Sequence, residues 1–325
     1  MQKAVTFNHT GYEPFLDFIK AYAIIMVLVG HTFPYQNYVA SNLWIGMQVP
    51  LFILVQSFHA LKKDKPVFSF KKTMTRVFIP FLAVEAIAFV FMVFVMGCDY
   101  KELIYNYLTG GGIGPGAYFP WVYLQIAILL PMLRPLFNHG ARWMQALIAI
   151  AVCEGLQVFA SVIDIPAPIY RLLAFRYLFL IFLGWIWVKD GIRMNKTTLL
   201  LSLLSLTALI YFSYFQGNDE PLFYDTRLHS HRWPSYYYVA ILFTYLLYLL
   251  YRKTYHYKFV EKSVRLLAKC SYEIFLLQMV VIAVCPAFSF IPEPHIEMVV
   301  RIASIFFISI YGGYLFNIAY NKLLK

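Results

Sequence analysis

Three polar side chains follow one stripe of the first long apolar segment, and together they could carry acid–base chemistry. His31 follows Lys20 by eleven residues. At about 100° per residue this is three helical turns plus about 20°, so both share one face, roughly 16 Å apart along the axis. Asp17 precedes Lys20 by three residues, a spacing at which the two charges pair. A lone histidine in a helix is more often a packed core residue, but an acid, a cation and an imidazole on one stripe favour a catalytic role for His31.

A basic run leads directly into the third apolar segment. Lys71, Lys72 and Arg76 stand just before Pro80. Two explanations fit such a run. It can anchor the topology beside anionic lipid, or it can form the mouth of a site for a polyanionic ligand, because lysine and arginine hold phosphates.

Five more ionisable residues lie inside apolar segments, where a charge is costly and usually faces a bundle interior or a wet cavity. Glu85 has no neighbour in sequence that suggests chemistry, so we expect it to be structural or to line a cavity. For Glu154, Arg176 and Arg301, structural pairing and a role in a site are equally good explanations. The fifth residue, Glu273, belongs to a motif described below.

Composition decides the class of protein. The 325 residues are 61% hydrophobic and 19% aromatic, and only 13% are charged. Soluble proteins are on average about 45–50% apolar and about 25% charged, so we expect an integral membrane protein embedded in a lipid bilayer. The net charge of +11 would suit nucleic acid, but long apolar runs separate the basic residues and no nucleic-acid partner is expected. Four cysteines without a pairing rhythm exclude a disulfide scaffold.

Two further patterns do not indicate a cofactor or metal site. The glycine-rich stretch 110–116 follows no strand, so it is not a nucleotide-binding loop; we expect a flexible outer loop, with Trp121 at the interface that follows. His229 and His231 have no third residue at metal-ligand spacing, and no metal is expected.

The apolar windows predict an all-α polytopic membrane protein. A helix crosses the hydrocarbon with about 20 apolar residues, and the connections between windows are too short for a separate soluble domain. We therefore expect residues 1–325 to form a single transmembrane domain. Ten windows meet the length and charge criteria: 15–33, 39–61, 77–97, 120–137, 144–163, 172–188, 199–215, 236–251, 272–290 and 298–320.

The distribution of lysine and arginine predicts the orientation. With ten spans and both termini in the cytoplasm, 20 of the 27 basic residues fall on the inner side, 4 on the outer side and 3 within spans. Positive charge is retained on the cytoplasmic side of membranes. We therefore expect a multi-pass protein with cytoplasmic N- and C-termini.

Three segments, in order, resemble the acyltransferase-3 family of polytopic membrane acyltransferases. The stretch 15–31 is similar to the first helix of that family, which carries an Asp, an Arg three residues on and a His eleven after the Arg. The basic run that ends at Arg76 and Pro80 resembles its second motif. The stretch 271–278, Ser-Tyr-Glu-Ile-Phe-Leu-Leu-Gln, resembles its Ser-Tyr-x-x-Tyr-Leu-x-His near the ninth helix.

The chain departs from the family pattern at three positions. Lys20 stands where the family usually has arginine, and lysine lacks the planar fork that grips a carboxylate or phosphate with two bonds. Phe275 replaces a common tyrosine and so lacks its hydroxyl. Gln278 stands where histidine often falls, and it forms hydrogen bonds but does not shuttle protons near pH 7. His31 is therefore the only titrating base carried over.

The resemblance implies an O-acyltransferase of the bacterial inner membrane. Such an enzyme moves an acyl group, usually acetyl, from cytoplasmic acyl-CoA to a hydroxyl of an envelope glycan or a lipid-linked sugar. No permanently bound cofactor is implied, because acetyl-CoA is a substrate. His31 would act as general base with Lys20 and Asp17 beside it, and Lys71, Lys72 and Arg76 would hold the CoA phosphates. The substrate-binding wall would comprise Ser271, Tyr272, Glu273, Gln278 and Trp121.

Another class of function fits the intramembrane charges. In a transporter or exporter of a sugar or amino-acid conjugate, the same residues would line a path instead of doing chemistry. The sequence shows neither inverted repeats nor paired broken helices, which favours the enzyme over the transporter.

Overall fold

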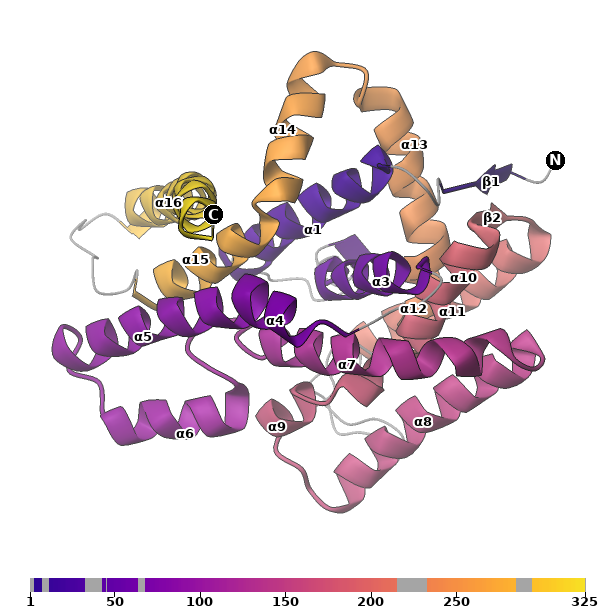
Figure 1. Ribbon diagram of the computed structural model, residues 1–325, viewed down its shortest axis with the longest axis horizontal. Coiled ribbons are helices and arrows are strands. Elements are labelled where there is room, and N and C mark those ends of the chain that lie inside the picture. Colours follow the sequence, from indigo (N-terminus) through magenta and orange to yellow (C-terminus); the bar gives the residue numbers. More distant parts are fainter. Residues whose placement is uncertain are drawn as a thin grey trace.

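The apolar windows fold into helices that pack side by side (Figure 1). A computed structural model describes residues 3–7, 12–32, 43–44, 46–63, 68–214, 233–284 and 294–324. Two short strands accompany the helices, β1 (Lys3–Val5) and β2 (Ile192–Met194). The longer helices are α1 (Pro14–Thr32), α3 (Gln48–Leu61), α5 (Ile79–Phe94), α6 (Tyr100–Gly110), α7 (Phe119–Asn138), α8 (Arg142–Val162), α10 (Leu178–Asp190), α11 (Lys196–Tyr214), α13 (Thr244–Thr254), α14 (Lys258–Lys269), α15 (Ser271–Val284) and α16 (Pro294–Leu323).

Short elements connect or extend these helices. A π-helical turn, η1 (Met74–Phe78), joins α4 (Phe70–Thr73) to α5 without a break, and a second, η4 (Val239–Phe243), joins α12 (Trp233–Tyr238) to α13. Between α8 and α10 the chain forms α9 (Ala167–Arg171) and one 3-10 turn, η2 (Ala174–Tyr177).

The structure confirms a predominantly α-helical architecture of the kind expected for a membrane protein. Within the described residues, six helices are long and apolar enough to cross a membrane, or seven if α14 and α15, which meet at a 70° bend, count as one span. Helix α3, with 14 residues, is shorter than the predicted window 39–61, most of whose first part lies outside the described residues. The count of ten spans and the cytoplasmic location of the termini stay predictions.

Helix α3 lies at the centre of the helix bundle and contacts α1, α7 and α10 (Figure 1). Its contact with α10 is close: a Cβ added to Gly184 would lie 2.6 Å from the Ser57 Cβ. Small residues permit such a close approach of two backbones. In a lipid bilayer, where no hydrophobic force drives helices together, van der Waals packing of this kind stabilises their association. On α1, the side chains of Ile19, Ile24 and Leu28 are fully buried. Helices α1 and α3 are therefore the inner layer against which the cavity walls are built.

The strands tie the start of the chain to the connection between α10 and α11. They pair antiparallel, with Val5 opposite Ile192. Gly191, at φ +67°, begins this turn, and a Cβ there would lie 2.2 Å from the Val5 carbonyl oxygen, so glycine is required. The first strand and the end of α10 therefore lie on the same side of the bundle.

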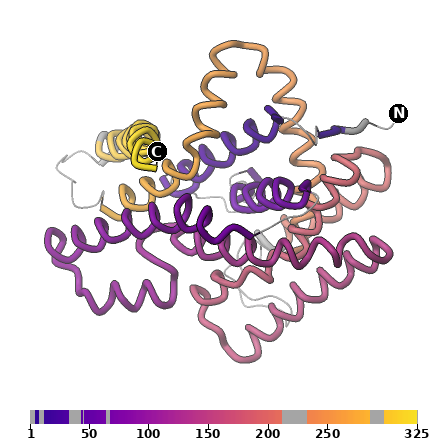
Figure 2. The backbone as a smooth tube through the Cα atoms, viewed as in Figure 1, coloured from indigo at the N-terminus to yellow at the C-terminus, as the bar shows by residue number. Residues whose placement is uncertain are grey.

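The C-terminal helices enclose the N-terminal end of α1. The α13–α14 hairpin stands beside α1, and α16, seen end-on, packs along α15 (Figure 2). In α14, Arg265 forms an ion pair with Glu261 at 2.6 Å, and its guanidinium lies 5.8 Å from the ring centre of Tyr12. This packing brings the basic C-terminal end of α14 next to the stripe of α1 that carries Lys20.

Candidate functional site

The ion pair predicted on α1 is present. The Nζ of Lys20 lies 2.5 Å from an Asp17 carboxylate oxygen, and both side chains are partly buried. The hydroxyl of Tyr12 donates a hydrogen bond of 2.5 Å to the other oxygen of the same carboxylate. Burial and this hydrogen bond raise the pKa of Tyr12, so its phenol stays protonated and remains a donor. Asp17 is thus held in place from two sides, and Lys20 is anchored at the edge of an opening in the bundle.

Lys20 and Arg76 line two adjoining cavities of about 400 Å³ each. We call the first the α15 cavity, because α15 and α16 supply one of its walls. The second, the α4 cavity, opens between α3, α4 and α7. Five residues belong to the walls of both: Lys20, Phe52, Arg76, Val77 and Tyr123.

The α4 cavity is strongly basic. Besides Lys20 and Arg76 its wall includes His59, Lys63 and Lys72, and no Asp or Glu is among the described residues that line it. The Asp17 carboxylate pairs with Lys20 at 2.5 Å, and the other basic side chains that converge here favour a ligand with several negative charges. The cavity therefore fits a polyanion better than a neutral molecule.

The structure divides the predicted basic run into two parts. All three side chains are exposed, but Lys72 and Arg76, four residues apart, line the α4 cavity, whereas Lys71 lines neither cavity. Arg76 lies in the π-helical turn η1, a kind of turn that is often found at functional sites. The run thus contributes two of its three cations to the cavity wall.

Sequence reasoning missed part of the α4 cavity. In the sequence, His59 falls within the apolar window 39–61, and Lys63 is one of the basic residues that indicate the orientation of the chain. Yet Gln56, His59, Ala60 and Lys63, all in the cavity wall, follow the i, i+3, i+4, i+7 spacing of one helical face. That polar stripe at the end of α3 was the available signal. For Lys269, which lines the α15 cavity, the sequence contains no such signal, because only the packing of α14 places this residue there.

Three predicted substrate-binding residues come together in the wall of the α15 cavity. The Tyr272 hydroxyl donates a hydrogen bond of 2.7 Å to the Val77 carbonyl, and the Ser271 hydroxyl donates one of 3.1 Å to the Ala268 carbonyl. Glu273 accepts a hydrogen bond of 2.9 Å from the Asn317 amide of α16. These bonds fix one wall of the cavity.

Two other predicted substrate-binding residues contact the glycine-rich stretch 110–116 and are not among the lining residues of either cavity. The Trp121 indole donates a hydrogen bond of 2.7 Å to the Gly111 carbonyl, and the Gln278 amide donates one of 3.2 Å to the Pro115 carbonyl. The buried Glu85 carboxylate accepts a hydrogen bond of 2.8 Å from the Ile113 N–H. Side chains from three helices therefore fasten this stretch, which the sequence suggested to be flexible.

His31 is the next-to-last residue of α1, and its side chain is exposed. It is not among the residues that line the two cavities, but Val27, four residues before it, lines the α15 cavity together with Lys20. The α15 cavity therefore follows the predicted stripe of α1 and ends about one turn, or roughly 6 Å of helix rise, before His31. Residues 33–42, which come next in the chain, lie outside the described part.

No cluster of three metal-ligating side chains occurs in the described ranges. His229 and His231, for which the sequence predicts no metal, lie outside them. The other intramembrane charges have local contacts: the Trp233 indole donates a hydrogen bond of 2.5 Å to Glu154, and the Arg176 guanidinium stacks 4.7 Å from the Tyr170 ring centre. Arg301 is exposed on α16.

Comparison with known families identifies the family of the chain. Residues 13–318 match the model of the family Acyl_transf_3, described as an acyltransferase domain. The chain belongs to the acyltransferase-3 family. Comparison with curated proteins and with solved structures gave no match. As a member of the acyltransferase-3 family with several apolar helices, the protein is a multi-pass membrane acyltransferase.

Within this acyltransferase, the fastened glycine stretch generates a stability prediction. Gly114 has φ +86°, and a Cβ there would lie 2.5 Å from the Met279 carbonyl oxygen of α15. Gly114→Ala should therefore destabilise the protein by about 1–3 kcal/mol and lower the melting temperature of the detergent-purified protein.

The matched control is Gly155→Ala in α8, where an added Cβ meets no atom within 4 Å. It should leave the melting temperature unchanged or raise it, because alanine favours a helix over glycine. An unchanged melting temperature for Gly114→Ala would show that the stretch is not held against α15.

Proposed function

We propose that the protein transfers an acyl group, acetyl in the first instance, from acyl-CoA to a hydroxyl of an envelope glycan or a lipid-linked sugar, in the bacterial inner membrane. The observation that carries this proposal is the position of Lys20. It lies on the predicted catalytic stripe of α1 and, with Arg76, in the wall shared by both cavities.

The α4 cavity supports acyl-CoA as the donor. CoA carries several phosphate charges, and the cations of this cavity are Lys20 of α1, Lys63 just after α3, Lys72 of α4 and Arg76 of η1. In the proposed arrangement Lys72 and Arg76 hold phosphates with charge-assisted hydrogen bonds. The predicted orientation places this opening in the cytoplasm, where acyl-CoA is available. The acyl end then lies in the α15 cavity, beside Val27 and Phe275.

His31 is the proposed general base. Its neutral imidazole takes the proton of the acceptor hydroxyl as that oxygen attacks the thioester carbonyl carbon. The C–O bond forms, the C–S bond breaks, and the CoA thiolate leaves. The cationic Lys20, oriented by Asp17, offsets negative charge of the donor where the two cavities adjoin, roughly 16 Å of helix rise from His31. Ser271, Tyr272 and Glu273 supply the polar part of the wall, while Trp121 and Gln278 act through the glycine-rich stretch that they hold.

His59 lines the α4 cavity rather than the α15 cavity. We assign this second histidine to the donor mouth, where it contributes to binding and not to proton transfer. The two histidines are therefore separable by experiment.

A kinetic test compares three His→Gln variants of purified protein given labelled acetyl-CoA and an acceptor glycan. His31→Gln should lower kcat by about 10²–10⁴, because glutamine forms hydrogen bonds but does not accept the proton. His59→Gln should mainly raise KM for acetyl-CoA.

The control is His256→Gln, in the exposed turn between α13 and α14, which should match wild type. A near-normal kcat for His31→Gln would show that His31 is not the general base. A wild-type protein that neither binds acetyl-CoA nor consumes its thioester would contradict the acyltransferase reaction and favour transport.

The basic wall generates a binding prediction. The double change Lys72→Ala and Arg76→Ala should weaken acetyl-CoA binding by tenfold or more, since a hydrogen bond to a charged group contributes about 1.5–3 kcal/mol. Wild-type binding should fall as salt rises, because screening weakens the attraction of an open basic mouth for phosphates.

Lys71→Ala is the matched control, since Lys71 belongs to the same run but lines neither cavity. It should keep affinity within about twofold of wild type. Equal affinities for Lys71→Ala and the double variant would mean that the run acts only as a topology anchor.

A further inference from the structure

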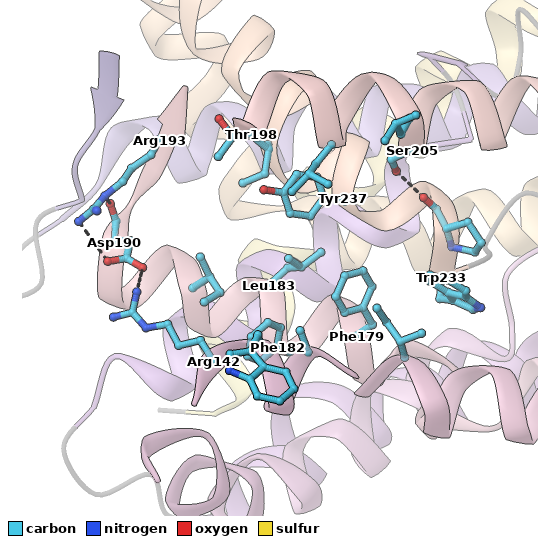
Figure 3. Close-up of a pocket in the computed structure, with 18 of the residues that line it drawn as sticks. Arg142, Phe179, Phe182, Leu183, Asp190, Arg193, Thr198, Ser205, Trp233 and Tyr237 are labelled. Atoms are coloured by element: carbon cyan, nitrogen blue, oxygen red, sulfur yellow. Dashed lines mark hydrogen bonds and ion pairs between the residues drawn. The ribbon is translucent and has the colours of Figure 1, made fainter. Parts of the chain in front are cut away.

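A third cavity lies apart from the α1 stripe, between α8, α10, α11 and α12 (Figure 3). Its volume is about 620 Å³, and its walls are apolar for most of their length. Phe179, Phe182 and Leu183 of α10 form the floor. No residue of the α1 stripe, the α4 cavity or the α15 cavity lines it. We call it the α10 groove.

One end of the α10 groove is charged. Asp190, at the end of α10, forms ion pairs with Arg142 of α8 and with Arg193 of β2, the latter at 3.1 Å (Figure 3). Two guanidinium groups against one carboxylate leave this end with a net positive charge. Both arginine side chains are about half exposed, at 55% and 50%. Because each guanidinium has five N–H donors, donors remain for an anion that approaches from outside.

The opposite end of the groove is aromatic. The Trp233 ring meets Phe179 edge-on with centroids 6.3 Å apart, and its indole N–H is held by Glu154. From Phe179 to Asp190 the helix rises by roughly 16 Å. The hydrocarbon core of a bilayer is about 30 Å thick, so the groove has the depth of one leaflet.

We propose that the α10 groove binds a membrane phospholipid with an anionic headgroup. One acyl chain lies along Phe179, Phe182 and Leu183, and the phosphate contacts Arg142 and Arg193. The apolar length matches a chain in one leaflet, and the net positive end complements an anionic headgroup and not a zwitterionic one. Since β2 pairs with β1, the headgroup lies on the side of the N-terminal strand. This lipid site is independent of the proposed reaction.

Native mass spectrometry of the delipidated full-length protein tests the site with two probes, phosphatidylglycerol and phosphatidylcholine with identical chains. Wild type should bind phosphatidylglycerol at least tenfold more tightly. The double change Arg142→Ala and Arg193→Ala should abolish that preference, a loss of roughly tenfold to thirtyfold for two cations near the headgroup. Ala208→Trp, in the groove wall, should weaken binding of both lipids.

Two further variants keep the test interpretable. Asp190→Asn removes the competing carboxylate and should strengthen phosphatidylglycerol binding, an outcome that misfolding does not produce. The double change Arg252→Ala and Lys253→Ala removes two exposed cations of α13 that do not line the groove, and it should leave the preference intact. Equal binding of the two lipids by wild type, or wild-type preference in the Arg142→Ala and Arg193→Ala variant, would overturn the proposal.

Discussion

A charge on an apolar membrane helix needs a partner or access to water, because the hydrocarbon core does not solvate charged groups. Lys20 of α1 has both, since it pairs with Asp17 and reaches two cavities. The rest of the site depends on this constraint. Helix α3 packs on one side of α1, α15 on another, and η1 brings Arg76 into the same wall. The space that remains among these elements is the proposed entrance for a polar ligand.

The two cavities of this acyltransferase differ in their chemistry as a result. Basic side chains from several elements meet in the α4 cavity. In the α15 cavity, Tyr272 and Ser271 donate hydrogen bonds to backbone carbonyls and Glu273 accepts one from Asn317, and these bonds hold the wall. The glycine-rich stretch is fastened by Glu85, Trp121 and Gln278. A donor and an acceptor that approach along α1 from opposite ends would meet beside its polar stripe.

Much of the fold was predictable from the sequence, since runs of about 20 apolar residues allow little except membrane helices. The 3.6-residue period also placed Asp17 next to Lys20 correctly. The 70° bend between α14 and α15 was not predictable, and neither was the position of Lys269 in the α15 cavity, because both depend on packing between segments distant in sequence. The position of His59 in the α4 cavity was not predictable for another reason: the polar stripe to which it belongs is short and lies at the end of an apolar window. Trp121 and Gln278 form hydrogen bonds to backbone carbonyls of a loop whose path the sequence does not reveal.

The central claim is that the stripe of α1 from Lys20 toward His31 forms one side of an acyl-CoA site that opens at the α4 cavity. An experimental structure of the protein with a non-hydrolysable thioether analogue of acetyl-CoA tests it most directly. The account predicts analogue phosphates within hydrogen-bond distance of Lys72 and Arg76, and the acyl end in the α15 cavity beside Val27. An analogue bound elsewhere, with both cavities empty, would contradict it.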